Sequence, residues 1–364
     1  MSNSGKRVTM RDIAAKLGVS PATVHRALAE KGNVSEDTLR VIQKTAMDMG
    51  YHTRKLAPAL ADSATKIAVI LRNIAPEYQV MIKDGVRRAI DELAEYNVHG
   101  DIIVLELENY LEELKNQLLK LSESDYNGVI FYVSETESAL GSDVIEKLIA
   151  NNIKIASIYL SEGINTFVDY SIEPEARRTG AVAANLLTLR GLGKDSKVAV
   201  FLGKTNFPLH RHYLDGFSAA CDECGIEIFD VIEHRDNPNI AYYAAEQFLR
   251  ENPDIDGIYS CTATSAPICK AIQDVGLQGK ITVIATDVMS DIVPYIKDGT
   301  VAATLFQDPF KMGYKAFRKL YYTIIGRDDI EKHETINPQI VVKANVDYYA
   351  RFCDTQNRII TEST

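Results

Sequence analysis

From Lys66 onward the sequence alternates between short β-rich apolar runs and longer amphipathic helical stretches, such as 78–96 and 211–224. This alternation restricts the fold more than any other feature, because it predicts parallel sheets covered by helices. The runs fall into two consecutive series, so we expect two α/β lobes. The runs are Ile67–Leu71, Ile102–Leu107, Gly128–Val133 and Ile153–Ile158, then Val198–Leu202, Glu227–Ile232, Gly257–Ser260, Ile281–Ala285 and Val301–Phe306.

The charge of the chain is unevenly distributed. The formal net charge is -10 over 364 residues, yet residues 1–66 hold eleven Lys and Arg against six Asp and Glu, a net of +5. The remaining residues carry a net of -15. This asymmetry predicts a basic nucleic-acid-binding module joined to an acidic body.

Apolar runs and cysteines point to a cytoplasmic protein. No run approaches the roughly 20 apolar residues of a membrane helix, and the N-terminus lacks the apolar stretch of a signal peptide. The five cysteines are an odd number in a long chain. Cys221 and Cys224 form a lone CxxC, for which reduced thiols are favoured over a metal or redox site.

Three short helices are predicted in the first fifty residues. Thr9 caps the first, and Gly18 ends it. Ser20 caps the second, and Pro21 takes its first position, where a missing N–H costs nothing. Ser35 caps the third, whose apolar residues recur at spacings of three and four. Two short helices joined by a glycine-containing turn and packed on a third form a helix-turn-helix unit; the competing interpretation is a small helical bundle with solvated charge.

The second helix of such a unit enters the major groove with its N-terminal residues toward the base edges. Small residues there, such as Ala22, permit close approach, and Arg26 can donate two hydrogen bonds to a guanine. The candidate base-reading residues are therefore Pro21, Ala22 and Arg26. The candidate phosphate contacts are Thr23, His25 and Asn33.

Val8–Tyr51, "VTMRDIAAKLGVSPATVHRALAEKGNVSEDTLRVIQKTAMDMGY", closely resembles the DNA-binding headpiece of the lactose-repressor (LacI) family. The resemblance is nearly continuous over these residues and favours the DNA-binding interpretation over the bundle. The family usually has Ser where this chain has His25, which leaves the local phosphate contact open.

The resemblance also implies a hinge after the Gly-Tyr pair, in which a leucine from each of two subunits wedges into the minor groove. Leu56 occupies the wedge position. Pro58 departs from the pattern, because a proline inside a helix removes a hydrogen bond and costs about 3 kcal/mol. Insertion of Leu56 at the cost of kinking the DNA and an ordinary flexible linker both remain open.

Polar residues follow several predicted strands of the body, where ligands of open α/β sheets bind. Arg211 opens a predicted helix, Asp287 ends the strand "ITVIATD", and Gln307 ends "TVAATLFQ". A carboxylate, a guanidinium and an amide together match the donors and acceptors of a polyol. Tyrosines can stack on a sugar ring in this chain, which has no Trp.

The body, residues 66–345, resembles the effector domain of the same family, which is similar to periplasmic sugar-binding proteins. The resemblance implies that Arg211, Asp287 and Gln307 bind the ligand. Four further residues lie in matching loops with weaker alignment: Asn73, Tyr78, Tyr159 and Glu173. Many members have Asn-Asp where this chain has Cys261-Thr262, so Thr262 is a candidate contact and the ligand differs from a common hexose or pentose.

The predicted organisation is a headpiece over residues 1–52, a hinge over 53–65, an effector-binding and dimerisation body over 66–345 and a tail over 346–364. The predicted function is that of a dimeric transcriptional regulator whose operator affinity depends on a bound sugar or polyol. We expect a repressor, because repression is the usual outcome in the family it resembles. The alternatives are a solute-binding protein of a sugar transporter and an α/β enzyme with a DNA-binding module. No catalytic, cofactor or metal-binding pattern stands out, so neither enzymatic activity nor a cofactor or metal is expected.

Overall fold

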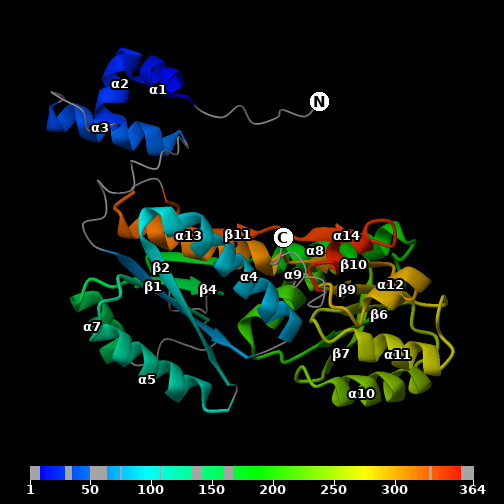
Figure 1. Ribbon diagram of the computed structural model, residues 1–364. Helices are drawn as coiled ribbons and strands as arrows, with labels where there is room; N and C mark the ends of the chain where they lie inside the picture. Colours follow the sequence, from blue (N-terminus) through cyan, green and yellow to red (C-terminus); the bar gives the residue numbers. More distant parts are fainter. Residues whose placement is uncertain are drawn as a thin grey trace. The chain divides into compact units, whose positions relative to one another are not determined.

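The computed structural model describes residues 9–28, 35–49, 64–73, 76–106, 108–132, 142–159, 167–327 and 330–353. The chain divides into two compact units, Met1–Lys66 with Ile90–His99, and Ile67–Ala89 with Gly100–Thr364. Figure 1 shows the order of the elements along the chain.

The headpiece consists of helices α1 (Met10–Leu17), α2 (Pro21–Leu28) and α3 (Glu36–Asp48). Each helix contacts the other two. Ile13, Val24, Ile42 and Ala46 are fully buried where the helices meet. The three predicted helices are therefore confirmed, and they pack around the small apolar core that their spacing indicated.

The N-terminal lobe is built on a six-stranded sheet in the order β11-β5-β4-β3-β1-β2. Its helices are α4 (Pro76–Leu93), α5 (Tyr110–Ser122), α7 (Ser142–Ala150) and α13 (Pro309–Ile324), and a 3-10 turn, η2 (Ala94–Tyr96), follows α4. Its strands are β1 (Thr65–Arg72), β2 (Val98–Leu105), β3 (Gly128–Tyr132), β4 (Lys154–Ile158), β5 (Tyr170–Pro174) and β11 (His333–Ile336).

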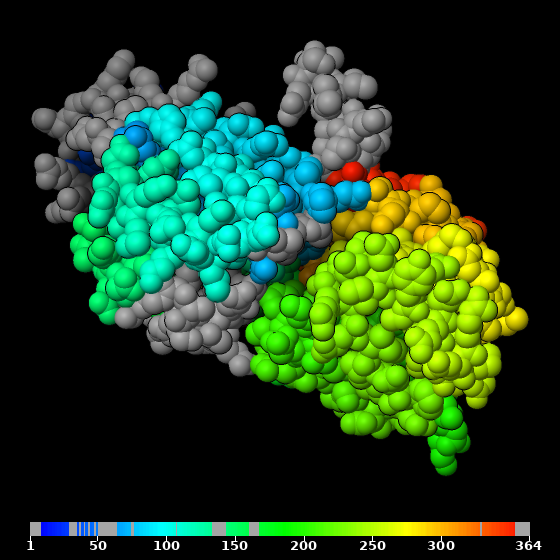
Figure 2. All heavy atoms as spheres, turned by 90° about the horizontal axis from the view of Figure 1, so that it is seen from below, coloured from blue at the N-terminus to red at the C-terminus, as the bar shows by residue number. Residues whose placement is uncertain are grey.

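The C-terminal lobe is built on a second six-stranded sheet in the order β12-β10-β9-β8-β6-β7. Its helices are α8 (Ala176–Leu189), α9 (Pro208–Cys224), α10 (Pro238–Glu251), α11 (Ala266–Asp274), α12 (Val293–Asp298) and α14 (Val346–Ala350). Its strands are β6 (Lys197–Leu202), β7 (Glu227–Glu233), β8 (Gly257–Ser260), β9 (Thr282–Thr286), β10 (Ala303–Phe306) and β12 (Gln339–Val341). In Figure 2 α10 and α11 appear in yellow-green and yellow on the surface of this lobe.

The two α/β lobes were predicted, but three strands were not: β5, β11 and β12. Strands β5 and β11 pair in parallel although about 160 residues separate them in sequence. Strand β12 pairs antiparallel with β10, so the expectation of purely parallel sheets is wrong at this edge. An antiparallel edge strand on a parallel sheet is common, because only the edge is free to accept it.

The chain passes between the two sheets three times: after β5, after β10 and between β11 and β12. Consequently α8 follows a strand of the N-terminal lobe but contacts β9 and β10, while α13 follows β10 but contacts β3, β4 and β5. Helices α8 and α9 also lie unusually close. A Cβ atom on Gly216 would sit 1.9 Å from the Arg177 carbonyl oxygen, so only glycine fits there.

Candidate functional site

Local hydrogen bonds determine the shape of the headpiece. Thr9 and Asp12 form a reciprocal capping box at the start of α1. Gly18 adopts the left-handed conformation, with φ 66°, that ends α1 and turns the chain. The Ser20 side-chain oxygen then accepts the Thr23 N–H at 3.0 Å, which caps α2 as predicted. The caps therefore define the turn that sets α2 against α1.

The exposed face of α2 carries the predicted DNA-reading residues. Pro21, Ala22, His25 and Arg26 are exposed and Thr23 is half-buried. Val24, Ala27 and Leu28, in contrast, are buried. The Arg26 Nε donates to the Ala22 carbonyl oxygen at 3.3 Å, so this side chain must leave its own helix to reach a base. The candidates Asn33 and Leu56, and the hinge with Pro58, lie outside the described residues.

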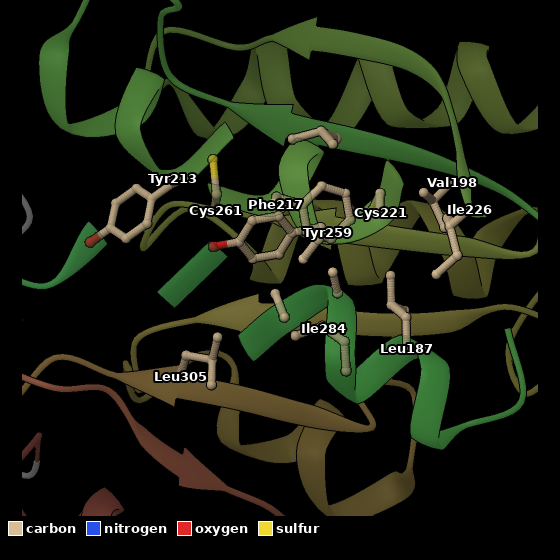
Figure 3. Close-up of a cluster of buried hydrophobic side chains, with 14 of the residues drawn as sticks. Leu187, Val198, Tyr213, Phe217, Cys221, Ile226, Tyr259, Cys261, Ile284 and Leu305 are labelled. Carbon is tan, nitrogen blue, oxygen red and sulfur yellow. The ribbon is translucent and has the colours of Figure 1, made fainter. Parts of the chain in front are cut away.

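In the body, Asp287 and Gln307 lie side by side at the carboxyl ends of the neighbouring strands β9 and β10. The Gln307 side-chain amide donates to the Asp287 carboxylate at 2.6 Å, and the Gln307 backbone N–H lies 3.4 Å from the other oxygen. Tyr213 of α9 donates its hydroxyl to the Gln307 side-chain oxygen at 2.5 Å. In Figure 3 the Tyr213 hydroxyl points away from the labelled apolar side chains. These three side chains form one hydrogen-bonded chain.

The Asp287 carboxyl group is fully buried, and burial raises its pKa to about 7, against the lowering effect of the Gln307 hydrogen bonds. Its titratable neighbours are tyrosines. Burial raises the pKa of Tyr78 and Tyr159 from the N-terminal lobe and of Tyr213 and Tyr259 from its own lobe, and the charge of Asp287 raises these pKa values further. The tyrosine hydroxyls therefore stay protonated and can donate.

The N-terminal lobe contributes three buried tyrosines at its strand ends and on α4. The hydroxyls of Tyr78 and Tyr159 are hydrogen-bonded to each other. The rings of Tyr132 and Tyr159 meet edge to face, with centroids 4.8 Å apart. Tyr159 has φ 65° directly after β4, a conformation that few bulky residues adopt. Such strain is typical of a functional position.

The remaining predicted ligand residues lie in different surroundings. Asn73 donates its amide to Glu106 at the end of the edge strand β2, at 2.8 and 3.0 Å. The Glu173 carboxylate, on β5, lies 3.4 Å from His333 Nε2, and its charge adds to the rise in the pKa of Tyr159 that burial causes. Arg211 is half-buried in the first turns of α9, which begins at Pro208, so the prediction that Arg211 opens this helix is wrong. Tyr213, two residues after Arg211, makes the contact from α9 to Gln307.

Thr262 is buried at the carboxyl end of β8, within a second polar group that the sequence interpretation missed. Its hydroxyl lies 3.5 Å from His234 Nε2 and is hydrogen-bonded to Asp236. His234 and Asp236 directly follow the predicted strand Glu227–Ile232. The rule that ligands bind beyond strand ends would have selected them.

A hydrogen bond also connects the two lobes. The Ser290 backbone N–H donates to the Glu77 carboxylate at 2.6 Å, and the Ser290 hydroxyl donates to the other oxygen of that carboxylate. Glu77 precedes Tyr78 on α4, and Ser290 follows Asp287 by three residues. This contact therefore joins the polar strand ends of one lobe to the tyrosines of the other.

Comparison with known proteins identifies both parts of the chain. Residues 9–54 match the family described as bacterial regulatory proteins, lacI family. The chain belongs to this family. Residues 67–328 match the periplasmic binding protein domain, so the body of this lacI-family regulator is a domain of that kind.

The relatives of this regulator support the same assignment. The HTH-type transcriptional regulator RegA of Clostridium saccharobutylicum is 25% identical over 255 residues, 69% of this chain and 72% of RegA. The HTH-type transcriptional repressor PurR of Photobacterium profundum is 21% identical over 345 residues, 93% of this chain and 98% of PurR. Both relatives are transcriptional regulators rather than enzymes.

Two solved structures show the fold of the body. A glucose-galactose binding protein from Geobacillus stearothermophilus aligns with a TM-score of 0.68 at 22% identity, over 78% of this chain and 99% of that protein. A solute-binding protein from Bacillus halodurans with bound myo-inositol aligns with a TM-score of 0.69 at 16% identity, over 80% and 99%. In the described part of this regulator, no helix combines the length and apolar character needed to cross a membrane.

Proposed function

We propose that this regulator binds a two-fold operator as a dimer, and that a sugar or polyol bound between its lobes changes its operator affinity. One observation carries the proposal. A single chain holds a helix-turn-helix with an exposed reading face and a periplasmic binding protein domain whose strand ends carry a buried carboxylate, amide and tyrosines. Neither a transporter component nor an enzyme needs the first of these parts.

On the DNA side, we propose that Pro21, Ala22 and Arg26 approach the bases, and that Thr23 and His25 contact phosphates. The exposure of this face of α2, opposite the buried Val24 and Leu28, supports the assignment. Asn33 and Leu56 remain predicted contacts outside the described residues.

On the ligand side, Asp287 accepts ligand hydroxyls, while the amide of Gln307 and the tyrosine hydroxyls both accept and donate. Tyr78 and Tyr159 lie near enough to Asp287 for its charge to shift their pKa values, which supports one common site for the two lobes. The remaining candidates are Arg211, Thr262, Glu173 and Asn73.

The proposed dimer is supported by apolar side chains on the surface of the C-terminal lobe. Ile240 and Tyr243 of α10 are 41% and 66% exposed, and Phe229 of the edge strand β7 is 41% exposed. Exposed apolar patches mark interaction surfaces. Two reading helices, one in each subunit, then match the two halves of a palindromic site.

We further propose that the regulator represses transcription, because repression is usual in its family and relatives such as PurR are named as repressors. It acts in the cytoplasm, where its operator DNA is found. The ligand exerts its control through its different affinities for the open and closed arrangements of the lobes.

The test begins with selection of a DNA site from genomic fragments, followed by binding titrations at fixed salt. Arg26→Ala is expected to lose about 1–3 kcal/mol of discrimination at one base position, because a bidentate contact to a base is removed. Arg190→Ala, an exposed arginine after α8 in the body, is the control of equal charge. Unchanged base discrimination by Arg26→Ala would refute the reading role of this arginine.

The ligand is sought by a thermal-shift screen of sugars and polyols, because a compound that binds the native state raises the melting temperature. Asp287→Asn is expected to lose this response while keeping ligand-free operator binding. A variant that still responds at wild-type ligand concentrations would count against Asp287.

A further inference from the structure

The second polar group of the C-terminal lobe, His234, Asp236 and Thr262, lies at the carboxyl ends of β7 and β8. These strands are neighbours of β6 on either side, and β8 pairs with β9, whose end carries Asp287. The two polar groups therefore occupy the same edge of one sheet. With about 4.8 Å between strands, three spacings separate the backbones of β7 and β9 by roughly 14 Å.

The hydrogen bonds of Thr262 determine which atoms of this group remain available. The Thr262 hydroxyl has one proton, and Asp236 can only accept it, so the threonine donates to the carboxylate. The Thr262 oxygen accepts the Thr264 N–H at 3.2 Å and lies 3.5 Å from His234 Nε2. The second contact assigns the ring proton to Nε2 and leaves Nδ1 as a bare acceptor.

His234 Nδ1 is a buried atom without a hydrogen-bond partner among the described residues, on a side chain that is fully buried. Burial lowers the pKa of His234 to about 4, so the ring is neutral at neutral pH and Nδ1 stays an acceptor. A buried acceptor without a partner has lost its hydrogen bonds to water and has gained none in exchange, which costs free energy. Such an atom in a native structure calls for a donor that the described residues do not supply.

Asp236 provides a second acceptor on the exposed side of the same group. The residue is solvent-exposed, with φ 54°, and its carboxylate lies against Gly203 at the end of β6. A Cβ atom on Gly203 would lie 2.4 Å from that carboxylate, so the glycine makes room for it. Burial raises the pKa of this carboxyl group, while His234, the Thr262 hydrogen bond and Lys204 lower it.

This group also faces the other lobe. Burial raises the pKa of Tyr132, which ends β3 in the N-terminal lobe; Arg72 at the end of β1 lowers this pKa, and the charge of Asp236 raises it. Asp287 influences Tyr78 and Tyr159 in the same manner. Since Tyr132 and Tyr159 are in ring contact, the two polar groups face adjacent parts of one row of tyrosines.

We propose that His234, Asp236 and Thr262 form a second recognition subsite, which binds a hydrogen-bond donor of the ligand other than the one bound by Asp287. This inference rests on the proposed ligand-binding function and deepens it. The atoms of the subsite that the hydrogen bonds of Thr262 leave unused, on the Asp236 carboxylate and at the buried His234 Nδ1, only accept. The ligand must therefore present an O–H or N–H group here, and an apolar edge or a bare ether oxygen is rejected.

The experiment compares ligand analogues with protein variants. Isothermal titration first measures the best sugar or polyol from the thermal-shift screen, its singly deoxygenated analogues, and its amino analogues at the same positions. Asp236→Asn is the main variant because Asp236 is exposed, so the substitution does not depend on refolding a core. Asp230→Asn is the matched control: it removes an exposed carboxylate on β7, the strand that precedes Asp236, whose oxygen accepts a neighbouring backbone N–H at 2.7 Å.

We expect Asp236→Asn to weaken the parent ligand at least tenfold, and Asp230→Asn to leave its affinity unchanged. One deoxygenated analogue should bind the wild-type protein as weakly as the parent ligand binds Asp236→Asn. That analogue should bind Asp236→Asn no more weakly than it binds wild type. A different analogue should show this relation with Asp287→Asn. The amino analogue shows which donor the subsite prefers. If it binds wild type more tightly than the parent does, and this gain is lost in Asp236→Asn, the preferred donor is an amine. If it binds more weakly than the parent, the preferred donor is a hydroxyl.

Equal weakening of all analogues by Asp236→Asn, or no weakening at all, would overturn the subsite. If Asp287→Asn still abolishes binding in that case, the proposed ligand-binding function stands and only the second subsite fails. If no sugar, polyol or amino derivative stabilises the wild-type protein, both proposals fail.

Discussion

Replacing Asp287 by Asn should change how the stability of the body depends on pH. In the unfolded chain an Asp carboxyl titrates near 3.9. In the folded chain burial raises the pKa of Asp287 to about 7. Between these two values the folded protein holds a proton that the unfolded chain has released, so wild-type stability falls as pH rises through this window. The difference of about 3 pKa units corresponds to roughly 4 kcal/mol.

Asn is the substitution that isolates this effect. It keeps the shape of the side chain, cannot titrate, and tolerates the left-handed backbone of this position, where φ is 68°. The free energy of unfolding of Asp287→Asn, minus that of wild type, should therefore increase by roughly 4 kcal/mol from pH 4 to pH 8 and then level off.

The comparison between variant and wild type is needed because two histidines act in the opposite direction. Burial lowers the pKa of His210 and of His234 to about 4, below the unfolded value of about 6.5. Their contribution to stability is present at high pH and is lost as pH falls from 6.5 toward 4. It is the same in both proteins and cancels in the difference.

Urea unfolding between pH 4.5 and 8.5, monitored by circular dichroism of the body, measures this difference. Asp254→Asn, an exposed aspartate between α10 and β8, controls for the loss of one negative charge. A difference between Asp287→Asn and wild type that does not change with pH would refute the raised pKa, and with it the account of Asp287 as a carboxyl group whose hydrogen bonds from Gln307 do not offset its burial.

Three further changes test the fold and the contact between lobes. Gly216→Ala should destabilise the body by about 3 kcal/mol, seen as a lower melting temperature, because its Cβ atom would lie 1.9 Å from the Arg177 carbonyl oxygen; unchanged melting would show that α8 and α9 separate at little cost. Glu77→Ala should weaken the ligand about tenfold in calorimetry, because the exposed hydrogen bonds to Ser290 across the lobes are lost; equal affinity would show that they do not favour the bound form. Thr9→Ala should destabilise α1 by about 1 kcal/mol and weaken operator binding, because the cap is removed; unchanged affinity at matched salt would contradict that.

The headpiece was predictable from the sequence because its determinants are local. Thr9, Ser20 and Ser35 cap helices within three residues of their own positions, and Gly18 adopts the one conformation that favours glycine. Helix spacing alone then selects the buried face. The hydrogen bond from Arg26 to the Ala22 carbonyl was not predictable, because a side-chain conformation leaves no trace in residue spacing.

The strands that escaped prediction are those whose partners are distant in sequence. Tyr170–Pro174 contains a glutamate and ends in proline, and His333–Ile336 begins with two polar residues, so neither shows a strand pattern. Each becomes a strand because the other lies beside it, and because β4 offers β5 a free edge. Tertiary context of this kind overrides local preference.

The candidate ligand site shows the same division. The polar ends of β9 and β10 were found from the strand pattern, and the strand order brings Asp287 and Gln307 together because these strands are neighbours. Tyr213 was missed because a buried tyrosine inside a helix is indistinguishable, by spacing, from a core residue. His234 follows a predicted strand, so the rule that ligands bind beyond strand ends applies to it, although its spacing alone is that of a buried core histidine. Their significance comes from the atoms they face: Gln307 for Tyr213, and Thr262 for His234.

Two of the candidate ligand residues also lie beside the points where the chain changes lobes. Gln307 is followed by Asp308, which has φ 54° and caps α13, the helix that packs on the N-terminal lobe. Glu173 lies three residues before the start of α8, the helix that packs on the C-terminal lobe. Arg178 of α8 donates to Asn337, between β11 and β12, at 2.7 Å, so two of the three crossings are hydrogen-bonded to each other.

Hinges consist of a few residues at the ends of elements, where small changes in backbone angle turn one lobe against the other. In the proposed site, a ligand held by Gln307 restrains the residue next to a crossing as well as the strand that ends there. Ligand affinity and lobe angle then depend on the same backbone bonds, so we expect each arrangement of the lobes to bind the ligand with its own affinity. In the proposed function, that difference is the free energy with which a bound sugar or polyol changes the affinity of the headpieces for DNA.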